Sequence, residues 1–185
     1  VNDEDIVALE DAARRFAIEE VRPHLAAWEA AGEFPRAIYA RLGELGWLGM
    51  GYPEALGGTP MPWRAKHALS IALARHTGSG GLLASGFSHA IGLPPIALHG
   101  SEALRARIVP DVLAGRAISA LAVTEPGGGS DVAALRCCAR RDGDEFVIDG
   151  EKTFITSGMR ADWITLAVRT DPQATGAAGI SLLAV

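Results

Sequence analysis

The sequence predicts an α+β protein in which helices precede strands. Up to about residue 115, apolar residues recur at three- and four-residue steps, which is the period of an amphipathic helix. After residue 115 that period disappears, and short apolar segments separated by Asp-Gly pairs indicate strands. The chain has 185 residues, of which 49% are hydrophobic, so it can bury a sizeable core. Helices followed by strands indicate segregated structure, with a helical domain at 1–116 and a β-domain at 117–185.

The helical part divides at prolines and glycines. Pro23 is expected to kink or split the first helix, because proline cannot donate an amide hydrogen bond. Pro35 suits the start of a second helix, and the glycine- and proline-rich residues 51–62 predict a loop. Further helices are expected at 63–76, at 82–91, and from a Ser101 cap to Gly115.

Six segments of the second part resemble strands: 118–124, 134–139, 145–148, 153–156, 163–168 and 180–185. Asp142-Gly143 and Asp149-Gly150 are typical of hairpin turns. We therefore expect a run of antiparallel strands. The last strand ends without a turn or a cap, and we expect further protein to follow it.

Charge and hydropathy exclude some functions. The net charge is −5 and no segment is rich in lysine or arginine, which argues against a nucleic-acid partner. The acidic N-terminus lacks the pattern of a secretory signal, and a cytoplasmic location is expected. The most apolar stretch, residues 80–98, contains polar residues and two prolines, and this predicts a buried helix and turn, not a membrane span.

Several catalytic patterns are absent. No glycine cluster fits a Rossmann or P-loop motif, and no serine lies in a GxSxG elbow. None of the five histidines has metalloprotease spacing, so no metal site is predicted; His89, in an apolar helix, is the histidine best placed to line a pocket. Cys137 and Cys138 are adjacent, which suits neither a metal site nor a relaxed disulfide, and two reduced thiols are expected.

Two segments carry the strongest chemical signal, Val123–Asp131 and Lys152–Gly158. Each continues an apolar run into a hydroxyl and then a glycine. Three successive glycines let the backbone take positive φ and approach another group closely. Both segments could be plain turns at a sheet edge. Together with Phe154 they also offer the aromatic wall, hydroxyls and free amides that a flavin ring needs.

Glu125 lies within the first segment and has two possible roles, a buried anchor for the turn or a general base. The anchor is favoured, because a carboxylate in this turn can accept hydrogen bonds from the amides of the glycine loop.

The two segments resemble the signatures of the acyl-CoA dehydrogenase family, TEPxxGSD and K-x-W-I-T-N-G. Segments of the helical part, including Leu45–Gly49, are also similar to that family, and the resemblance covers nearly the whole chain. It implies a helical N-terminal domain, a middle β-barrel domain that is incomplete here, and FAD between domains. Phe154 and Ser157 depart from the usual tryptophan and asparagine, and the aromatic wall is kept.

The resemblance also implies roles for individual residues. Val123 and Thr124 would bond the pyrimidine edge of the flavin, Phe154 would stand beside the ring, and Thr156 would donate toward N5. Ser130 would meet both FAD and the CoA part of the substrate. The full set of expected cofactor-binding residues is Leu121, Val123, Thr124, Gly129, Ser130, Phe154, Ile155 and Thr156.

The implied reaction is oxidation of an acyl-CoA thioester to the trans-2-enoyl-CoA, in which α-proton removal accompanies β-hydride transfer to flavin N5. No catalytic base is assigned to this chain, because the family carries its glutamate in a C-terminal helical domain outside these residues. The chain alone is expected to be inactive. An electron-transfer flavoprotein would accept the electrons, and a homo-oligomer, dimer or tetramer, is expected. The alternatives are an acyl-CoA oxidase, a flavin monooxygenase, and a non-catalytic interaction module.

Overall fold

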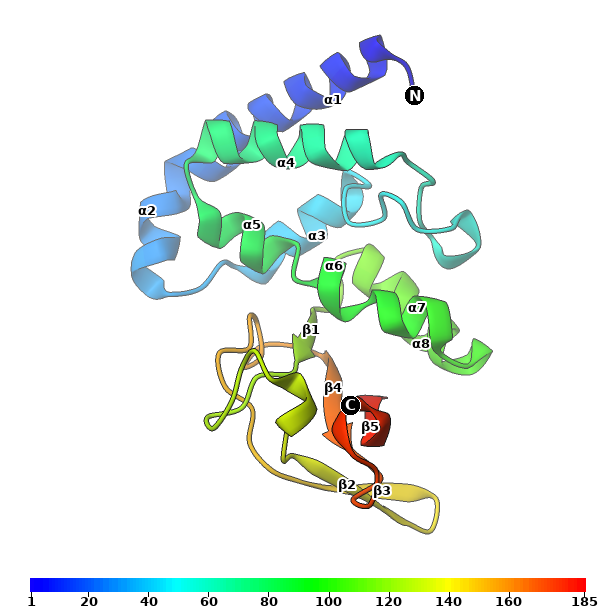
Figure 1. The fold of residues 1–185 in the computed structure, drawn as a ribbon. Helices are drawn as coiled ribbons and strands as arrows, with labels where there is room; N and C mark the ends of the chain where they lie inside the picture. Colours follow the sequence, from blue (N-terminus) through cyan, green and yellow to red (C-terminus); the bar gives the residue numbers. More distant parts are fainter. The chain divides into compact units, whose positions relative to one another are not determined.

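The computed structural model describes all 185 residues, which form two compact units (Figure 1). The first unit contains residues 1–87 and 106–117 and is helical. The second contains residues 88–105 and 118–185 and holds every strand of the protein. The predicted α+β class, with helices preceding strands, is confirmed.

The helical unit contains α1 (Asp3–Phe16), α2 (Arg22–Ala31), α3 (Arg36–Glu44), α4 (Trp63–Thr77), α5 (Gly80–Gly86) and most of α8 (Glu102–Leu113). Asn2 caps α1 through reciprocal hydrogen bonds with Asp5, a capping box. The break expected near Pro23 is present as a π-helical turn, Ala17–Val21, just before α2. Such a turn suits this place because the proline cannot donate to the preceding turn.

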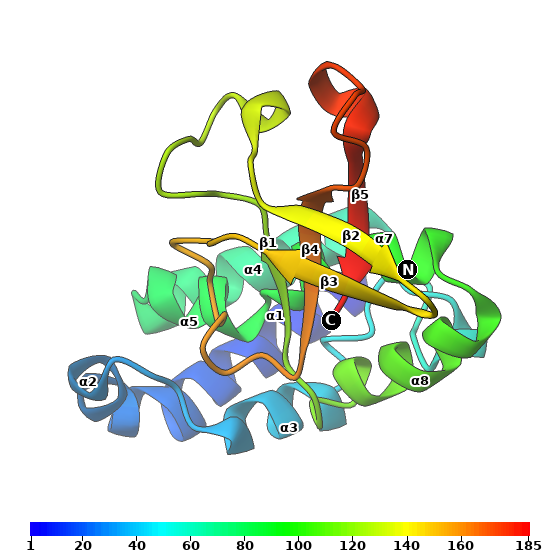
Figure 2. The ribbon, with the colours of Figure 1, turned by 90° about the horizontal axis from the view of Figure 1, so that it is seen from below.

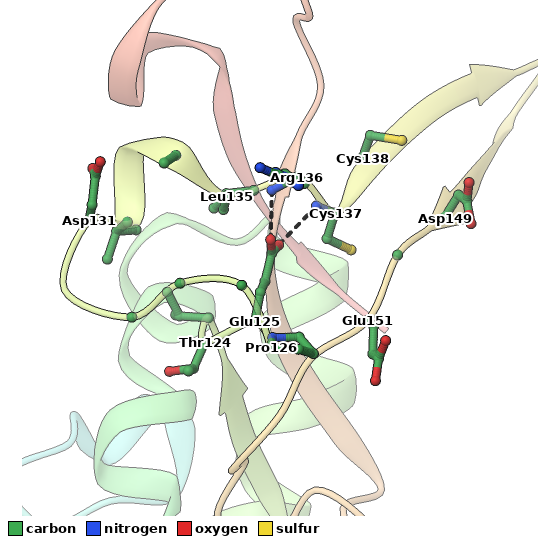
Figure 3. A pocket seen from close by; sticks show the side chains of 17 residues that line it. Thr124, Glu125, Pro126, Asp131, Leu135, Arg136, Cys137, Cys138, Asp149 and Glu151 are labelled. Carbon is green, nitrogen blue, oxygen red and sulfur yellow. Dashed lines mark hydrogen bonds between the residues drawn. The ribbon is translucent and has the colours of Figure 1, made fainter.

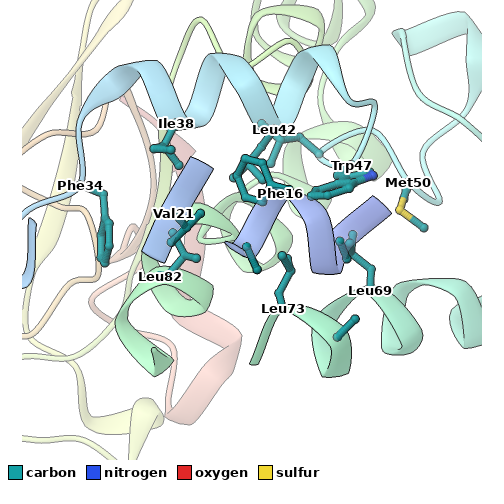
Figure 4. Packing of buried hydrophobic residues seen from close by; sticks show 14 of the residues in the cluster. Phe16, Val21, Phe34, Ile38, Leu42, Trp47, Met50, Leu69, Leu73 and Leu82 are labelled. Carbon is teal, nitrogen blue, oxygen red and sulfur yellow. The ribbon is translucent and has the colours of Figure 1, made fainter. Parts of the chain in front are cut away.

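The core of this unit lies between α1, α3 and α4 (Figure 4). The Phe16 and Trp47 rings meet edge to face, with 5.3 Å between their centroids. Leu42 from α3 and Leu73 from α4 are fully buried beside them. The apolar residues that recur at three- and four-residue steps in the sequence are therefore the residues that form this core.

Leu73→Ala is expected to lower the free energy of unfolding by about 2–5 kcal/mol, because it leaves a cavity in this cluster. Ile71 lies two residues away on the same helix and is 54% exposed, so Ile71→Ala is the matched control. That control should change stability by about 0.5 kcal/mol or less. Urea unfolding checks both values, and equal losses in the two variants would contradict the assignment of Leu73 to the core.

The second unit contains α6 (His89–Gly92), α7 (Pro94–His99) and a five-stranded sheet. Its strands are β1 (Ser119–Ala122), β2 (Cys138–Asp142), β3 (Glu145–Asp149), β4 (Trp163–Arg169) and β5 (Ile180–Ala184). The order is β1-β4-β2-β3, and β5 pairs with β4 (Figure 2). The sheet is open, as expected for an incomplete barrel.

The strand directions correct the expectation of purely antiparallel pairing. Strands β2–β3 and β4–β5 are antiparallel, but β1 and β2 both run parallel to β4. Strands β1 and β4 pair in parallel because the loop between β3 and β4 brings the chain back to the place where β1 begins. The Asp162 carboxylate accepts the amide hydrogen of Ile118 at 2.8 Å, and the Asp162 amide donates to the Ile118 carbonyl at 2.9 Å. The start of β4 is thereby held beside the start of β1.

Helix α6 packs directly on β1. The Ser88 hydroxyl donates to the Ser119 carbonyl at 3.0 Å, and the buried Thr165 hydroxyl donates to the Gly92 carbonyl at 2.5 Å. A Cβ on Gly92 would come within 2.7 Å of the Ala120 carbonyl, so only glycine allows this approach. Residues 88–105 thus pack with the sheet, while the domain limits 1–116 and 117–185 stay a prediction.

Four local predictions were wrong. Residues 82–91 do not form one helix, because α5 ends at Gly86 and α6 begins at His89. Residues 132–134 form a 3-10 turn, and strand β2 begins only at Cys138. Residues 153–156 form no strand, and no hairpin follows Asp149-Gly150. At residues 153–156 a local turn overrides strand propensity. After Asp149-Gly150 the overriding factor is a tertiary contact, the close approach of Gly150 to Cys137.

No single helix is long and apolar enough to cross a membrane, although α5 together with α6 and α7 passes that test by length and composition. Leu82 in α5, Leu93 just before α7 and Ile96 within α7 are buried in the protein.

Candidate functional site

The two segments with the strongest chemical signal meet in the structure. The Thr153 amide donates to the Thr124 carbonyl at 2.9 Å, and the Lys152 ammonium donates to the Val123 carbonyl at 2.9 Å. The first segment leaves the end of β1, as the sequence predicts. The second lies in the loop between β3 and β4. The meeting is therefore between a strand end and a loop, not between two strand ends.

Glu125 takes part in this contact, and Figure 3 shows its carboxylate bonded to the amides of Arg136 and Cys137. Its carboxylate accepts the amide hydrogens of Arg136 at 2.7 Å and Cys137 at 2.8 Å, and it pairs with the Lys152 ammonium at 2.8 Å. The side chains of the pair are 11% and 9% exposed. The expected anchor role fits these contacts, but the amides come from the two residues just before β2, not from the glycine loop.

The protonation of Glu125 follows from these contacts. Burial alone would raise the pKa of this carboxyl, but the hydrogen bonds from Lys152, Arg136 and Cys137 outweigh it, so the pKa is lowered. A carboxylate with a lowered pKa and three donors is a poor proton acceptor. This arrangement argues against Glu125 as a general base.

The glycine loop turns tightly after Glu125. The Glu125 amide donates to the Gly128 carbonyl at 3.3 Å, and the Gly128 amide returns a bond at 3.1 Å. None of the three glycines has positive φ, so that expectation was wrong. A Cβ on any of them would meet nothing within 4 Å, and the amides of Gly127, Gly129 and Ser130 bond no protein group. One side of the loop is open for another molecule.

A cavity of about 460 Å³ lies beside this loop. Figure 3 shows it bounded by the glycine loop, by residues 131–138 and by the end of β3. Its charged lining residues are Asp131, Arg136, Asp149, Glu151 and Glu125. Of the predicted cofactor-binding residues, Val123, Thr124 and Gly129 line it, and the other five do not.

Those five residues lie in two places. Leu121 is half-buried in β1, and Ser130 is exposed in the glycine loop. Phe154, Ile155 and Thr156 lie together in the loop after Lys152. Phe154 is 93% exposed and adopts a left-handed backbone conformation with φ +55°. The Gly158 amide closes a turn on the Ile155 carbonyl at 2.9 Å.

Other candidates and missed residues lie around this site. His89 is buried but is not part of the cavity. Cys137 and Cys138 are free thiols that line it, and burial raises the pKa of Cys137. Sequence reasoning gave no role to Lys152 or to Arg169, whose guanidinium donates to the Ala133 carbonyl at 2.7 Å and so holds the segment before β2. No local pattern reveals either contact, because each joins distant segments.

Two protein-family models together match nearly the whole chain. Residues 3–116 match the model of the acyl-CoA dehydrogenase N-terminal domain, and residues 120–185 match that of the middle domain. The chain belongs to the acyl-CoA dehydrogenase family. The resemblance of its two signature segments is thereby confirmed at the level of the family.

Curated relatives include the mitochondrial long-chain specific acyl-CoA dehydrogenase of Sus scrofa, 37% identical over 183 residues, 95% of this chain and 40% of that protein. The (2S)-methylsuccinyl-CoA dehydrogenase of Cereibacter sphaeroides is 36% identical, over 97% of this chain and 33% of that protein. A crystal structure of a probable acyl-CoA dehydrogenase from Mycobacterium abscessus superposes with a TM-score of 0.94 at 46% identity. The whole of this chain aligns with 48% of the length of that protein. The chain thus spans less than half of each relative.

Proposed function

We propose that the complete protein containing this chain oxidises an acyl-CoA thioester to the trans-2-enoyl-CoA with FAD as its redox cofactor. One observation supports this most strongly. The Thr153–Thr124 hydrogen bond and the Lys152–Val123 bond bring together the two segments whose residues resemble the family's flavin-contacting signatures.

The chemistry of the donor set fits a flavin. The hydroxyls of Thr124, Ser130 and Thr156 have no partner within the chain, and neither do the amides of Gly127 and Gly129. The pyrimidine edge of a flavin offers carbonyl and nitrogen acceptors to such donors. Phe154 adds an aromatic surface of which almost all is exposed. An aromatic ring with this much exposed surface is suited to cover a flat heterocycle.

FAD, when bound, would supply the hydride-accepting N5 of the reaction. Thr124 and the glycine loop would hold and orient the cofactor. Thr156 would donate a hydrogen bond from the loop beside Phe154. Ser130 would meet both the cofactor and the CoA part of the substrate. The base that removes the α-proton would come from outside these residues, since Glu125 is committed to three donors.

The substrate class follows from the family, and the acyl group is left open because the relatives named above act on different acyl groups by name. We also propose that the complete protein forms a homo-oligomer, dimer or tetramer, and that it passes electrons to an electron-transfer flavoprotein. Both proposals rest on the family relationship.

The direct test uses the complete protein. It should purify yellow, and its visible absorption should bleach under anaerobic conditions when a suitable acyl-CoA is added. Slow reoxidation by oxygen would favour the dehydrogenase over an oxidase or a monooxygenase. A colourless protein that takes up no FAD on soaking would refute the proposal.

Thr156→Ala is expected to slow anaerobic flavin reduction about tenfold, because it removes one hydrogen-bond donor to the reacting ring. CoA binding should change much less, since Thr156 lies in the flavin segment. Thr175→Ala is the matched control, because Thr175 is also exposed and makes no side-chain hydrogen bond. Stopped-flow absorbance measures both variants, and a Thr156→Ala rate equal to that of the control would reject this role.

A further inference from the structure

We propose that Glu125 and Lys152 are positioning residues whose buried ion pair sets the placement of Thr124 relative to Phe154 and Thr156. This inference rests on the proposed function, because it concerns residues that would contact the flavin. It assigns no proton transfer to either side chain.

The pair joins three separate segments of the chain. Lys152 reaches from the loop after β3 to the Val123 carbonyl and to Glu125 Oε1. Glu125 Oε1 also accepts from the Cys137 amide, and Oε2 accepts from the Arg136 amide, both just before β2. The segment after β1, the segment before β2 and the loop after β3 therefore meet at one carboxylate.

The flavin-contacting candidates are direct sequence neighbours of these two residues. Thr124 lies between Val123 and Glu125, both of which contact Lys152. Phe154 follows Lys152 by two residues and Thr156 by four. The Thr153–Thr124 bond alone would hold the segments at one point and let them rotate. The added contacts of Lys152 lie on either side of Thr124, so they restrain that rotation.

Burial makes the pair sensitive to change. Its side chains are 11% and 9% exposed, and Lys152 has no second carboxylate partner. A nearly buried charge that loses its partner is poorly solvated, so the segments would shift to hydrate it. A displacement of about 1 Å is enough to disturb an aligned reacting group. The surface pair Arg140–Asp142, at 3.5 Å and 68% and 64% exposed, lacks this property.

The test compares four variants of the complete protein: Lys152→Met, Lys152→Arg, Glu125→Gln and the matched control Arg140→Met. Two measurements need no catalysis. Hydrogen exchange on the flavin-free protein follows the amides of Thr153, Arg136 and Cys137. Titration of the flavin-free protein with FAD gives the dissociation constant and the absorption band shape of the bound flavin.

Lys152→Met should speed exchange at the Thr153 amide at least about tenfold, weaken FAD binding about tenfold or more, and alter the flavin band shape. Glu125→Gln should also speed exchange at Arg136 and Cys137, because the carboxylate accepts from both amides. Lys152→Arg keeps the charge and should recover most of the affinity. Arg140→Met should match the parent throughout.

Several results would overturn the inference. One is FAD affinity and band shape in Lys152→Met equal to those of Arg140→Met. A second is Lys152→Arg binding FAD no better than Lys152→Met while both remain folded by urea titration, because the charge would then be irrelevant. If the parent binds FAD and the variants equal it, the proposed function stands and the positioning role fails. If the parent takes up no FAD, the proposed function itself fails.

Discussion

Gly115→Ala is expected to destabilise the helical unit by about 4 kcal/mol, a large share of the stability of an ordinary domain. Gly115 ends α8 with φ +70°, and a Cβ there would overlap the carbonyl oxygen of Tyr39. Two costs combine in this variant. The left-handed conformation strains a residue with a side chain, and the added carbon collides with backbone that cannot rotate away.

A second glycine separates these two costs. Gly32 ends α2 with φ +74°, but a Cβ there would meet nothing within 4 Å. Gly32→Ala should therefore lose only about 1 kcal/mol, the cost of the left-handed conformation. Urea unfolding of both variants measures the difference. Equal losses of unfolding free energy in the two variants would show that the close contact between Gly115 and Tyr39 adds no cost of its own.

Acid is expected to weaken the sheet unit through Glu125. The folded pKa of this carboxyl lies below its ordinary value of 4.5. The unfolded chain therefore takes up the proton first, and the stabilisation is fully present above about pH 4.5 and is lost as the pH falls through the folded pKa. Protonation removes the charge that holds Lys152 and weakens the bonds from the Arg136 and Cys137 amides.

Glu125→Gln provides the comparison, because it has no titrating group at this position. At pH 7 it should be less stable than the parent by about 3 kcal/mol, since Lys152 is left nearly buried without a counter-charge. That gap should shrink as the pH falls below about 4.5. Urea unfolding across the pH range measures it, and a gap of constant size would contradict this role of Glu125.

The sequence predicted much of the helical unit. The three- and four-residue apolar period placed the face of α1 that holds Phe16, and Trp63 and Ser101 marked the starts of α4 and α8 within a residue. These features are local, since helix hydrogen bonds and caps join residues three or four apart. The break near Pro23 was predictable for the same reason, because proline removes a donor wherever it stands.

The strands were harder to predict. The β-branched pattern of residues 153–156 favours a strand, yet Phe154 and Ser157 both adopt left-handed conformations in a turn. Gly150 resembles a hairpin glycine, but a Cβ on it would come within 2.6 Å of Cys137 Cα, so its glycine serves close packing. Strand propensity depends on neighbours that are distant in sequence, and these neighbours decided both cases.

For the candidate site, the sequence by itself determined the residue types and the family. Hydroxyls, an aromatic residue and three successive glycines in two ordered segments can be read from the sequence, and they led to the flavin hypothesis. Only the tertiary structure decided that Lys152 reaches Val123 and Glu125, that Glu125 accepts from the two amides just before β2, and that β1 runs parallel to β4. Those contacts join residues 11 to 44 positions apart. Local preference does not encode them, because they form only when the folded unit brings together groups that are distant in sequence.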